Sequence, residues 1–328
     1  MSHKYPISDH CDGTHFHNLD PNVSTSKSFG EVLKWKLGSQ STDWPKTKTA
    51  DLVKPQISKE LVIDELRVTF INHATVLVQW RGINIITDPV LAEKLGPFSF
   101  LNLKRYRDSG VQFKELPKID YVFISHNHYD HLDLPTLEQI DKRDAPMYIV
   151  PLGASKNLPV SFRSRTEELD WWQSAKLSGG DLEITLVPAQ HWSRRNIGDT
   201  NLSLWGAAVF KAHGRQVYFA GDTGYSNHFQ ITEKKLGPMD VALLPIGAYE
   251  PRWFMKDSHM NPEDAVKAHQ DLKSKNTIAI HFGTFRLTDE GIEDPEKDLT
   301  IALKKYAVSA KDFSVPKNGQ SFLFGSNR

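Results

Sequence analysis

Residues 122–133 read VFISHNHYDHLD, with three histidines and an aspartate inside six positions, directly after a run of apolar β-formers. Histidine is seldom clustered for packing alone. Each ring carries two nitrogens that need partners when buried, and it changes charge near neutral pH. The stretch therefore predicts a strand that ends in a chemical site, made of His126, His128, Asp130 and His131.

The composition limits both the class of protein and the kind of metal site. The 328 residues are 39% apolar, which is enough for a sizeable core. The 40 basic side chains balance 40 acidic ones, which argues against nucleic acid as a partner. Cys11 is the single cysteine, so an intrachain disulfide and a cysteine-based zinc site are excluded. Any metal must be held by His, Asp or Glu.

The sequence shows neither a secretory signal nor a membrane span. Its start, MSHKYPISDHCDGTHFHNLDP, is polar, and no later stretch approaches the roughly 20 apolar residues that cross a bilayer. We therefore expect a cytoplasmic protein. The segments NLKRYRDSG and LKWKLG combine basic and aromatic residues as membrane-surface segments do, but solvated helix faces look the same. Peripheral membrane contact stays open, as does a homodimer.

The composition and the hydrophobic pattern of the chain change near residue 61. Residues 1–60 are polar and irregular, with one helix expected in SFGEVLKWKLG, and we treat them as an N-terminal extension. Residues 61–328 alternate short β-branched runs with helical segments such as NPEDAVKAHQDLKSK, where Asn261 and Pro262 form a start signal, and PEKDLTIALKKYAV. This pattern predicts one α/β (α+β) domain in which helices cover sheets.

Four predicted strands each end at a side chain that can bind a metal. YVFIS leads to His126, ITLVPAQ to His191, QVYFAG to Asp222 and TIAI to His281. The carboxyl ends of strands are where α/β sheets build their sites. Convergence from four places is hard to obtain by chance, so we expect these residues to meet.

Together the candidates make a set of seven nitrogen and oxygen ligands: His126, His128, Asp130, His131, His191, Asp222 and His281. Seven are too many for one tetrahedral ion, but they suit two ions with a shared carboxylate. Imidazole and carboxylate without thiolate favour two Zn²⁺, with iron and manganese left open. Such a pair, about 3.5–4 Å apart, activates water for hydrolysis. The alternative is a set of unrelated surface and core histidines.

The motif HNHYDH, with a distant His, the Asp of GDTG and the His of AIHFGTF, resembles the metallo-β-lactamase superfamily. Over residues 61–328, segments such as IITDP, PAQHWSRR and GAYEPRWFMK are similar to the phospholipases D that hydrolyse N-acyl phosphatidylethanolamine and to their bacterial relatives. The resemblance implies a four-layer αβ/βα sandwich with a binuclear site at one edge.

The resemblance also implies roles for single residues. His126, His128 and His191 would hold one ion, and Asp130, His131 and His281 the other, with Asp222 bridging them. Asp88 of IITDP matches a carboxylate that orients ligands from outside the ligand set, and His73 matches a position next to the site. The chain departs from the pattern at Asn72, where relatives often have Gly.

Further candidates for substrate contacts lie in AYEPRWFMKDSHM, between a predicted strand and helix. Arg252 could pair with a phosphate, and Tyr249 and Trp253 could line a path for an acyl chain. The alternative is a packed loop in which Arg252 binds carbonyls or an acidic neighbour. We expect His259 from the same loop to take part in the reaction.

Two candidates directly follow predicted ligands. Arg194, next to Arg195, would place a cation beside a phosphodiester, although a surface ion pair explains it equally well. Tyr225 could donate to a developing oxyanion, although a buried tyrosine often only satisfies a backbone group.

The function expected by resemblance is zinc-dependent cleavage of N-acyl phosphatidylethanolamine to N-acylethanolamine and phosphatidic acid. Metal-bound hydroxide would attack phosphorus, and Asp130 would orient it or accept its proton. The main alternative is hydrolysis of a soluble phosphodiester or a sugar-phosphate lactone at the same centre, because fold does not fix function. A metal-binding protein without catalysis is the non-enzymatic alternative, and the full ligand set counts against it.

Overall fold

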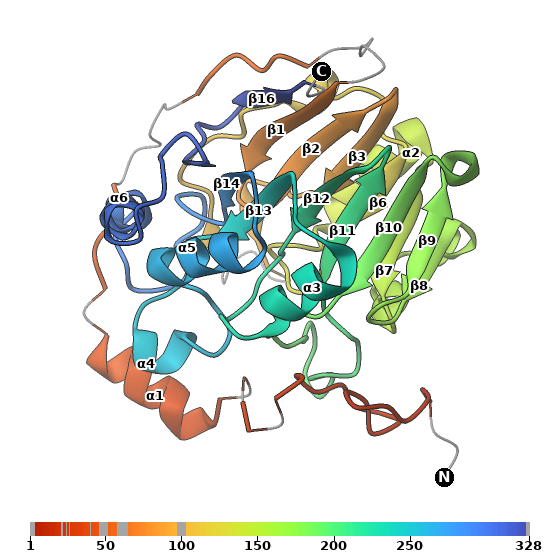
Figure 1. Ribbon diagram of the computed structural model, residues 1–328. Coiled ribbons are helices and arrows are strands. Elements are labelled where there is room, and N and C mark those ends of the chain that lie inside the picture. Colours follow the sequence, from red (N-terminus) through yellow and green to blue (C-terminus); the bar gives the residue numbers. More distant parts are fainter. Residues whose placement is uncertain are drawn as a thin grey trace.

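Two seven-stranded sheets form the centre of the computed structural model (Figure 1). The structure describes residues 4–20, 22–23, 25, 27–39, 41–45, 52–57, 65–96 and 103–325. The expected boundary between residues 60 and 61 lies outside these ranges. The first sheet has the order β16 (Ser321–Phe324), β1 (Leu66–Asn72), β2 (Thr75–Trp80), β3 (Ile83–Thr87), β6 (Tyr121–Phe123), β7 (Met147–Pro151) and β8 (Thr166–Leu169).

The second sheet has the order β15 (Phe313–Ser314), β14 (Asn276–Ile280), β13 (Val241–Pro245), β12 (Arg215–Phe219), β11 (Ala207–Ala212), β10 (Leu182–Val187) and β9 (Ser174–Leu177). A small hairpin-like pair, β4 (Lys94–Leu95) and β5 (Leu103–Lys104), lies apart from both. Short 3₁₀ helices occupy Phe113–Glu115, Ala154–Asn157, Val160–Arg165 and Ser178–Gly180.

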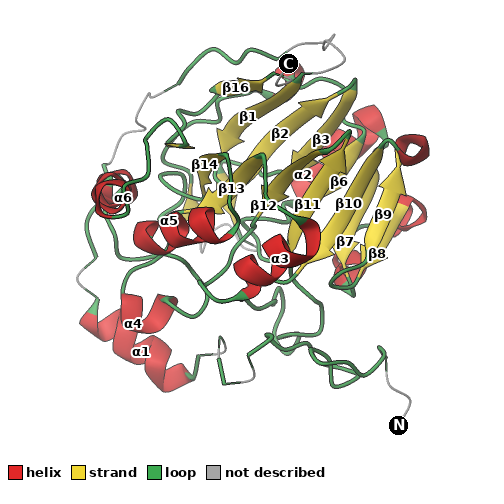
Figure 2. Cartoon of the chain, viewed as in Figure 1, coloured by secondary structure: helices red, strands yellow, loops and turns green. Residues whose placement is uncertain are grey.

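Helices cover the outer faces of the two sheets (Figure 2). In the first sheet, Phe123 points into the large core shared by both sheets, while its neighbour Val122 packs in a second core with Leu137 and Ile140 of α2 (Leu134–Asp144). On the other side, α3 (His228–Leu236) and α5 (Pro262–Asp271) cover the second sheet, and α6 (Asp294–Lys305) packs on α5. The expected four-layer αβ/βα sandwich is confirmed.

The directions of the strands explain why distant residues meet. β6 runs parallel to β3 and β7 in the first sheet. In the second, β12, β13 and β14 are parallel, and β10 has the same direction because two antiparallel pairings separate it from β12. The carboxyl ends of these strands therefore share one edge in each sheet.

The expected helices begin at the capping residues described below. The Asn261 side chain accepts from the Asp264 N–H at 2.8 Å and caps α5, with Pro262 in its first turn. The helix expected in the N-terminal extension is α1 (Phe29–Gly38), which begins with a capping box between Ser28 and Glu31. It lies beside the short α4 (Arg252–Met255), where Trp35 packs on Phe254 (Figure 1).

Within the described ranges, none of the helices combines the length and apolar content needed to cross a bilayer.

A buried histidine attaches the N-terminal segment to the strand-rich part of the chain. The His10 ring stacks on Trp171 with centroids 4.4 Å apart, and its nitrogens lie 2.7 Å from Asp170 and 2.6 Å from Asp9. Burial lowers the pKa of His10, but hydrogen bonds and charge from Asp170 and Asp9 outweigh it, so that the pKa is raised above 6.5. The folded environment therefore favours the charged form of the ring.

We expect His10→Gln to lower the free energy of unfolding by about 1 kcal/mol near pH 6, through loss of the charged pair. Because the pKa is raised on folding, this stabilisation is full below 6.5 and is lost as pH rises through the folded pKa. Urea unfolding of wild type and variant should show a smaller difference at about pH 9 than at about pH 6. An equal difference at both would contradict the charged pair.

Candidate metal centre

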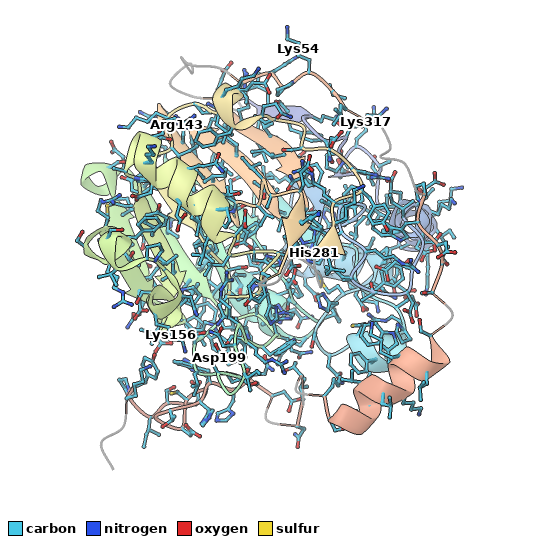
Figure 3. The ribbon with its side chains drawn as sticks, turned by 180° about the vertical axis from the view of Figure 1, so that it is seen from behind. Lys54, Arg143, Lys156, Asp199, His281 and Lys317 are labelled. Atoms are coloured by element: carbon cyan, nitrogen blue, oxygen red, sulfur yellow. The ribbon has the colours of Figure 1, made fainter. Side chains whose placement is uncertain are left out.

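The residues expected at strand ends do follow strands in the structure. Asp88 comes directly after β3 and His281 directly after β14, while His126, His191 and Asp222 follow β6, β10 and β12 within a few residues. All of these side chains are buried. Figure 3 labels His281 near the middle of the view, away from Lys54, Arg143 and Lys317 at the rim.

One group of ring nitrogens lies on one side of the cluster. Nε2 of His126 is 2.8 Å from Nδ1 of His128, which is 3.3 Å from Nε2 of His191. All three nitrogens point to a common centre, where one ion can accept a lone pair from each.

A second group lies on the other side. Asp130 Oδ2 is 3.4 Å from Nε2 of His131 and 3.5 Å from Nε2 of His281. The same oxygen accepts a hydrogen bond from Nε2 of His73 at 3.0 Å, so that His73 fixes the carboxylate from behind. His73 thus lies against the site, as the resemblance implied.

Asp222 stands between the two groups. Its Oδ2 is 3.1 Å from Nε2 of His131, and 4.0 and 3.9 Å from Nε2 of His126 and His191. Its Oδ1 is 3.1 Å from Nε2 of His281. One carboxylate therefore faces both groups, as a bridging ligand would.

Asp88 orients two of the rings. It accepts from Ser125 N–H at 2.7 Å, from Ser125 Oγ at 2.6 Å and from Nδ1 of His131 at 2.6 Å. Ser125 Oγ in turn accepts from Nδ1 of His126 at 2.9 Å. Both rings therefore carry their proton on Nδ1 and turn Nε2 to the centre. No sequence pattern points to Ser125, since a serine before a histidine has many other uses.

The backbone at the cluster is held in unusual conformations. His73, Asp88 and His281 have φ of 47°, 35° and 59°, which costs about 1–3 kcal/mol for each side chain other than glycine. Gly221, before Asp222, also has positive φ, and a Cβ there would stand 2.6 Å from Cβ of Ser125. The two sheets thus approach closely at this edge only because residue 221 is glycine.

The donor set fits divalent cations. Nε2 of His131 and His281 and Oδ1 of Asp222 face the centre and are buried, yet make no hydrogen bond within the described part of the chain. Burial raises the pKa of Asp222, but His131 and His281 outweigh it and hold the pKa well below 3.8. Burial lowers the pKa of His281, and Asp222 and Asp130 raise it to about 9. The ionised carboxylates therefore favour positive charge within the cluster, and a divalent cation supplies such charge.

The rings of the first group, His126, His128 and His191, have lowered pKa values. Burial, reinforced by the nearby rings of His131 and His128, lowers the pKa of His126 well below 6.5. Burial also lowers the pKa of His128 to about 4. These rings are neutral at physiological pH, which is the form that binds metal.

A cavity of about 510 Å³ opens onto the cluster at His128, Asp130 and Asp222. Its lining includes the apolar side chains of Val32, Trp35, Ala248, Phe254, Met255 and Leu287. Cationic and polar groups of Lys27, Arg194, Arg195, Ser258 and His259 belong to the same lining, and the Lys27 ammonium lies 5.7 Å from the centre of the Phe254 ring. This combination suits a ligand that has both an anionic group and an apolar portion.

Apart from the predicted metal ligands, His259 and Arg194 are the sequence candidates that line this cavity. Nδ1 of His259 is 4.0 Å from Asp222 Oδ2, and burial lowers the pKa of the ring to about 4. Arg194 is exposed at the wall and forms no ion pair with any residue in the described ranges. Its neighbour Arg195 instead donates to the carbonyls of Asn127 and Leu132.

The other candidates have structural partners. Arg252 donates to the His259 carbonyl at 2.8 Å and to Asp264 at 2.7 Å, which is the packed-loop alternative. The Tyr225 hydroxyl donates to Asp271 at 2.7 Å, and it is not part of the cavity wall.

Tyr249 and Trp253 line a neighbouring cavity of about 600 Å³ with Trp35, Glu250, Asp289, Glu290, Asp294 and Asp298. The Tyr249 hydroxyl donates to Asp298 at 2.5 Å, and the Trp253 ring lies under the Lys34 ammonium at 4.9 Å. Trp35 borders both cavities. Neither Tyr249 nor Trp253 therefore faces the cluster directly.

Comparisons with known proteins agree with the geometry. The model of the beta-lactamase superfamily domain matches residues 83–282. The N-acyl-phosphatidylethanolamine-hydrolyzing phospholipase D 1 of Caenorhabditis elegans is 38% identical over 244 residues, 71% of this chain and 68% of that protein. The mitochondrial enzyme of the same name from Saccharomyces cerevisiae is 36% identical over 238 residues, 71% of this chain and 51% of that protein.

Solved structures share the fold. An isothiocyanate hydrolase from Delia radicum gut bacteria has a TM-score of 0.62 at 21% identity, covering 79% of this chain and 100% of that one. A metallo hydrolase from Ignicoccus hospitalis has a TM-score of 0.59 at 22% identity, covering 79% and 98%. The resemblance inferred from the sequence is thus confirmed. The chain belongs to the β-lactamase superfamily, as a metal-dependent hydrolase of the metallo-β-lactamase fold.

Proposed function

We propose that the protein is a zinc-dependent phosphodiesterase of the phospholipase D type, which cleaves N-acyl phosphatidylethanolamine to N-acylethanolamine and phosphatidic acid. The observation that carries the proposal is the cavity beside the cluster, whose lining combines apolar side chains with cationic and polar ones. An amphiphilic phosphodiester matches this combination. Two relatives at 38% and 36% identity carry the same activity in their names.

In this proposal His126, His128 and His191 hold one zinc ion, Asp130, His131 and His281 hold the other, and Asp222 contacts both. The set of imidazole and carboxylate donors without thiolate is the chemical support for zinc. When bound, the ions polarise a phosphoryl oxygen and lower the pKa of water. The hydrolase domain comprises residues 61–328.

The protein side chains supply positioning and proton transfer. Asp130 lines the cavity, and its Oδ2 is held by His73, so it can orient the attacking water or accept its proton. Asp88 keeps the rings of His126 and His131 in place from behind. His259 and Arg194 line the cavity and bind phosphate oxygens in this proposal. The alcohol that leaves is N-acylethanolamine, which retains the amide group of the substrate.

A lipid substrate also calls for contact with a membrane surface. Leu33 and Leu37 of α1 are 46% and 81% exposed, and Trp253 of the adjacent α4 is 45% exposed. Lys34 and Lys36 stand among them on the same helix. Apolar and basic side chains together are typical of interfacial helices. We therefore include peripheral membrane contact through α1 and α4 in the proposal.

The first test is a mass-spectrometric assay of zinc-loaded protein on N-acyl phosphatidylethanolamine in mixed micelles. We expect release of both products by wild type, and loss of at least about a hundredfold in rate after chelation or in His126→Ala, with recovery on adding zinc only in wild type. No release from protein with a measured full zinc content would leave the metallohydrolase and turn the search to soluble phosphodiesters and lactones.

Replacing the cavity carboxylate gives a second test. We expect Asp130→Ala to lower kcat by about 10²–10⁴-fold, the usual size of a general acid–base contribution. Rates and zinc content should be measured together, because loss of the ion would have the same effect. A variant that binds normal zinc and keeps the wild-type rate would remove Asp130 from the mechanism.

The apolar side chains of the cavity lining give a third test. We expect Phe254→Ala to raise KM for long-chain substrates about tenfold, since the variant loses roughly 1.4 kcal/mol or more of apolar contact, with little change for short acyl chains. Ile301→Ala, at an exposed position on α6, is the matched control. Equal effects on long and short chains would argue against acyl binding by these side chains.

A further inference from the structure

His191 occupies a position where its backbone has no strand partner. It comes after the end of β10 at Val187, and no backbone group within the described ranges bonds to its N–H or C=O. Both groups are buried, and a buried backbone group without a partner costs about 1–3 kcal/mol. A metal ligand in such a segment needs support from elsewhere.

Asn18 of the N-terminal extension supplies that support. Its Oδ1 accepts from His191 N–H at 3.0 Å, and its Nδ2 donates to His191 C=O at 3.0 Å. The side-chain amide thus pairs with both groups of one residue, as a neighbouring strand would. Thr25 Oγ1 donates to the same carbonyl at 3.1 Å. Asn18 is 6% exposed, so water does not readily replace it.

The extension also holds the loop that orients the His191 ring. Nδ1 of His191 donates to the Ser258 carbonyl at 2.9 Å, which leaves Nε2 facing the cluster. Lys27 forms an ion pair at 3.1 Å with Asp257, the residue before Ser258. Asn18, which precedes Thr25, therefore contacts the backbone of His191. Lys27, which follows Thr25, contacts the loop whose Ser258 carbonyl binds the His191 ring.

Asn18 is itself fixed in place. Two residues earlier, Phe16 is 1% exposed in the main core, and its N–H donates to the Asn201 carbonyl at 2.9 Å. Figure 1 shows the red N-terminal segment passing along the lower edge of the molecule before it reaches α1. Val32 and Trp35 of α1 then form part of the cavity wall. The superfamily model matches residues 83–282 and does not include this segment.

We propose that Asn18 is a positioning residue that sets His191 for metal binding, so that the N-terminal extension is part of the metal centre. The proposal rests on the role of His191 as a ligand in the proposed function. It does not depend on the identity of the substrate. Outer partners of ligands commonly change metal affinity by about 10–100-fold.

The test compares zinc affinity of the full chain by competition with a chromophoric chelator, without substrate. We expect Asn18→Leu, which has a similar size and no amide, to weaken zinc binding about tenfold. Asn18→Asp keeps the acceptor for His191 N–H and should fall between Leu and wild type. Asn22→Leu is the control, because Asn22 is an exposed asparagine of the same segment that bonds to Asp20.

Thermal unfolding of the metal-free and zinc-loaded forms separates positioning from a purely structural role. Positioning predicts that Asn18→Leu loses mainly the increase in Tm that zinc provides. An equal loss of Tm in both forms with unchanged zinc affinity would overturn the proposal. So would zinc affinity in His191→Ala equal to wild type, since His191 would then not be a ligand. If wild type binds zinc but leaves N-acyl phosphatidylethanolamine intact, the substrate proposal fails and the role of Asn18 stands.

Discussion

The burial of five imidazole rings and two carboxylates in one cluster is the constraint on which the rest of the structure depends. Removing such groups from water is unfavourable unless every polar atom has a partner. The outer nitrogens of His131, His126 and His191 find theirs in Asp88, Ser125 and the Ser258 carbonyl, whereas the inner atoms face one another. Divalent cations suit those inner atoms, and no single strand or helix could supply so many partners.

Two stacked sheets meet this requirement with little specialised structure. Parallel strands bring their carboxyl ends to one edge, where the loop after β6 adds four ligand side chains and the loops after β10, β12 and β14 add one each. The close approach at Gly221 and the strained backbone at His73, Asp88 and His281 are local to the same edge. Part of the conformational cost of the fold lies at this edge, and ordinary apolar packing in the two cores stabilises the sheets.

The sequence predicts the parts of the fold that depend on local pattern. β-branched runs mark the central strands, and Asn261 with Pro262 marks α5, because capping and periodicity act over a few residues. The strand β8, with the sequence TEEL, has no such pattern and forms through pairing with β7. The clustering of His126, His191, Asp222 and His281 was foreseeable only because each follows a strand.

Partners that act across long sequence distances were not foreseeable. Asn18 binds the backbone of His191, Ser258 binds its ring and Ser125 binds Asp88 through hydrogen bonds that no spacing encodes. Residue type alone also misdirects. Tyr225 and Tyr249 have the chemistry of substrate contacts, but their hydroxyls donate to the helix carboxylates Asp271 and Asp298. Only the packing of α5 and α6 decides this.

The bond between Asn18 and His191 joins residues 173 positions apart, and this separation has a consequence for biosynthesis. The N-terminal extension leaves the ribosome long before β10 and the loop after it have been made. The extension therefore remains without His191 as its partner until both sheets are nearly complete, because Ser258 and His281 are synthesised later still. Contacts of such long range form late in folding. Capture of metal would then be among the last steps, so a partly made chain would carry the histidine cluster without a finished binding site.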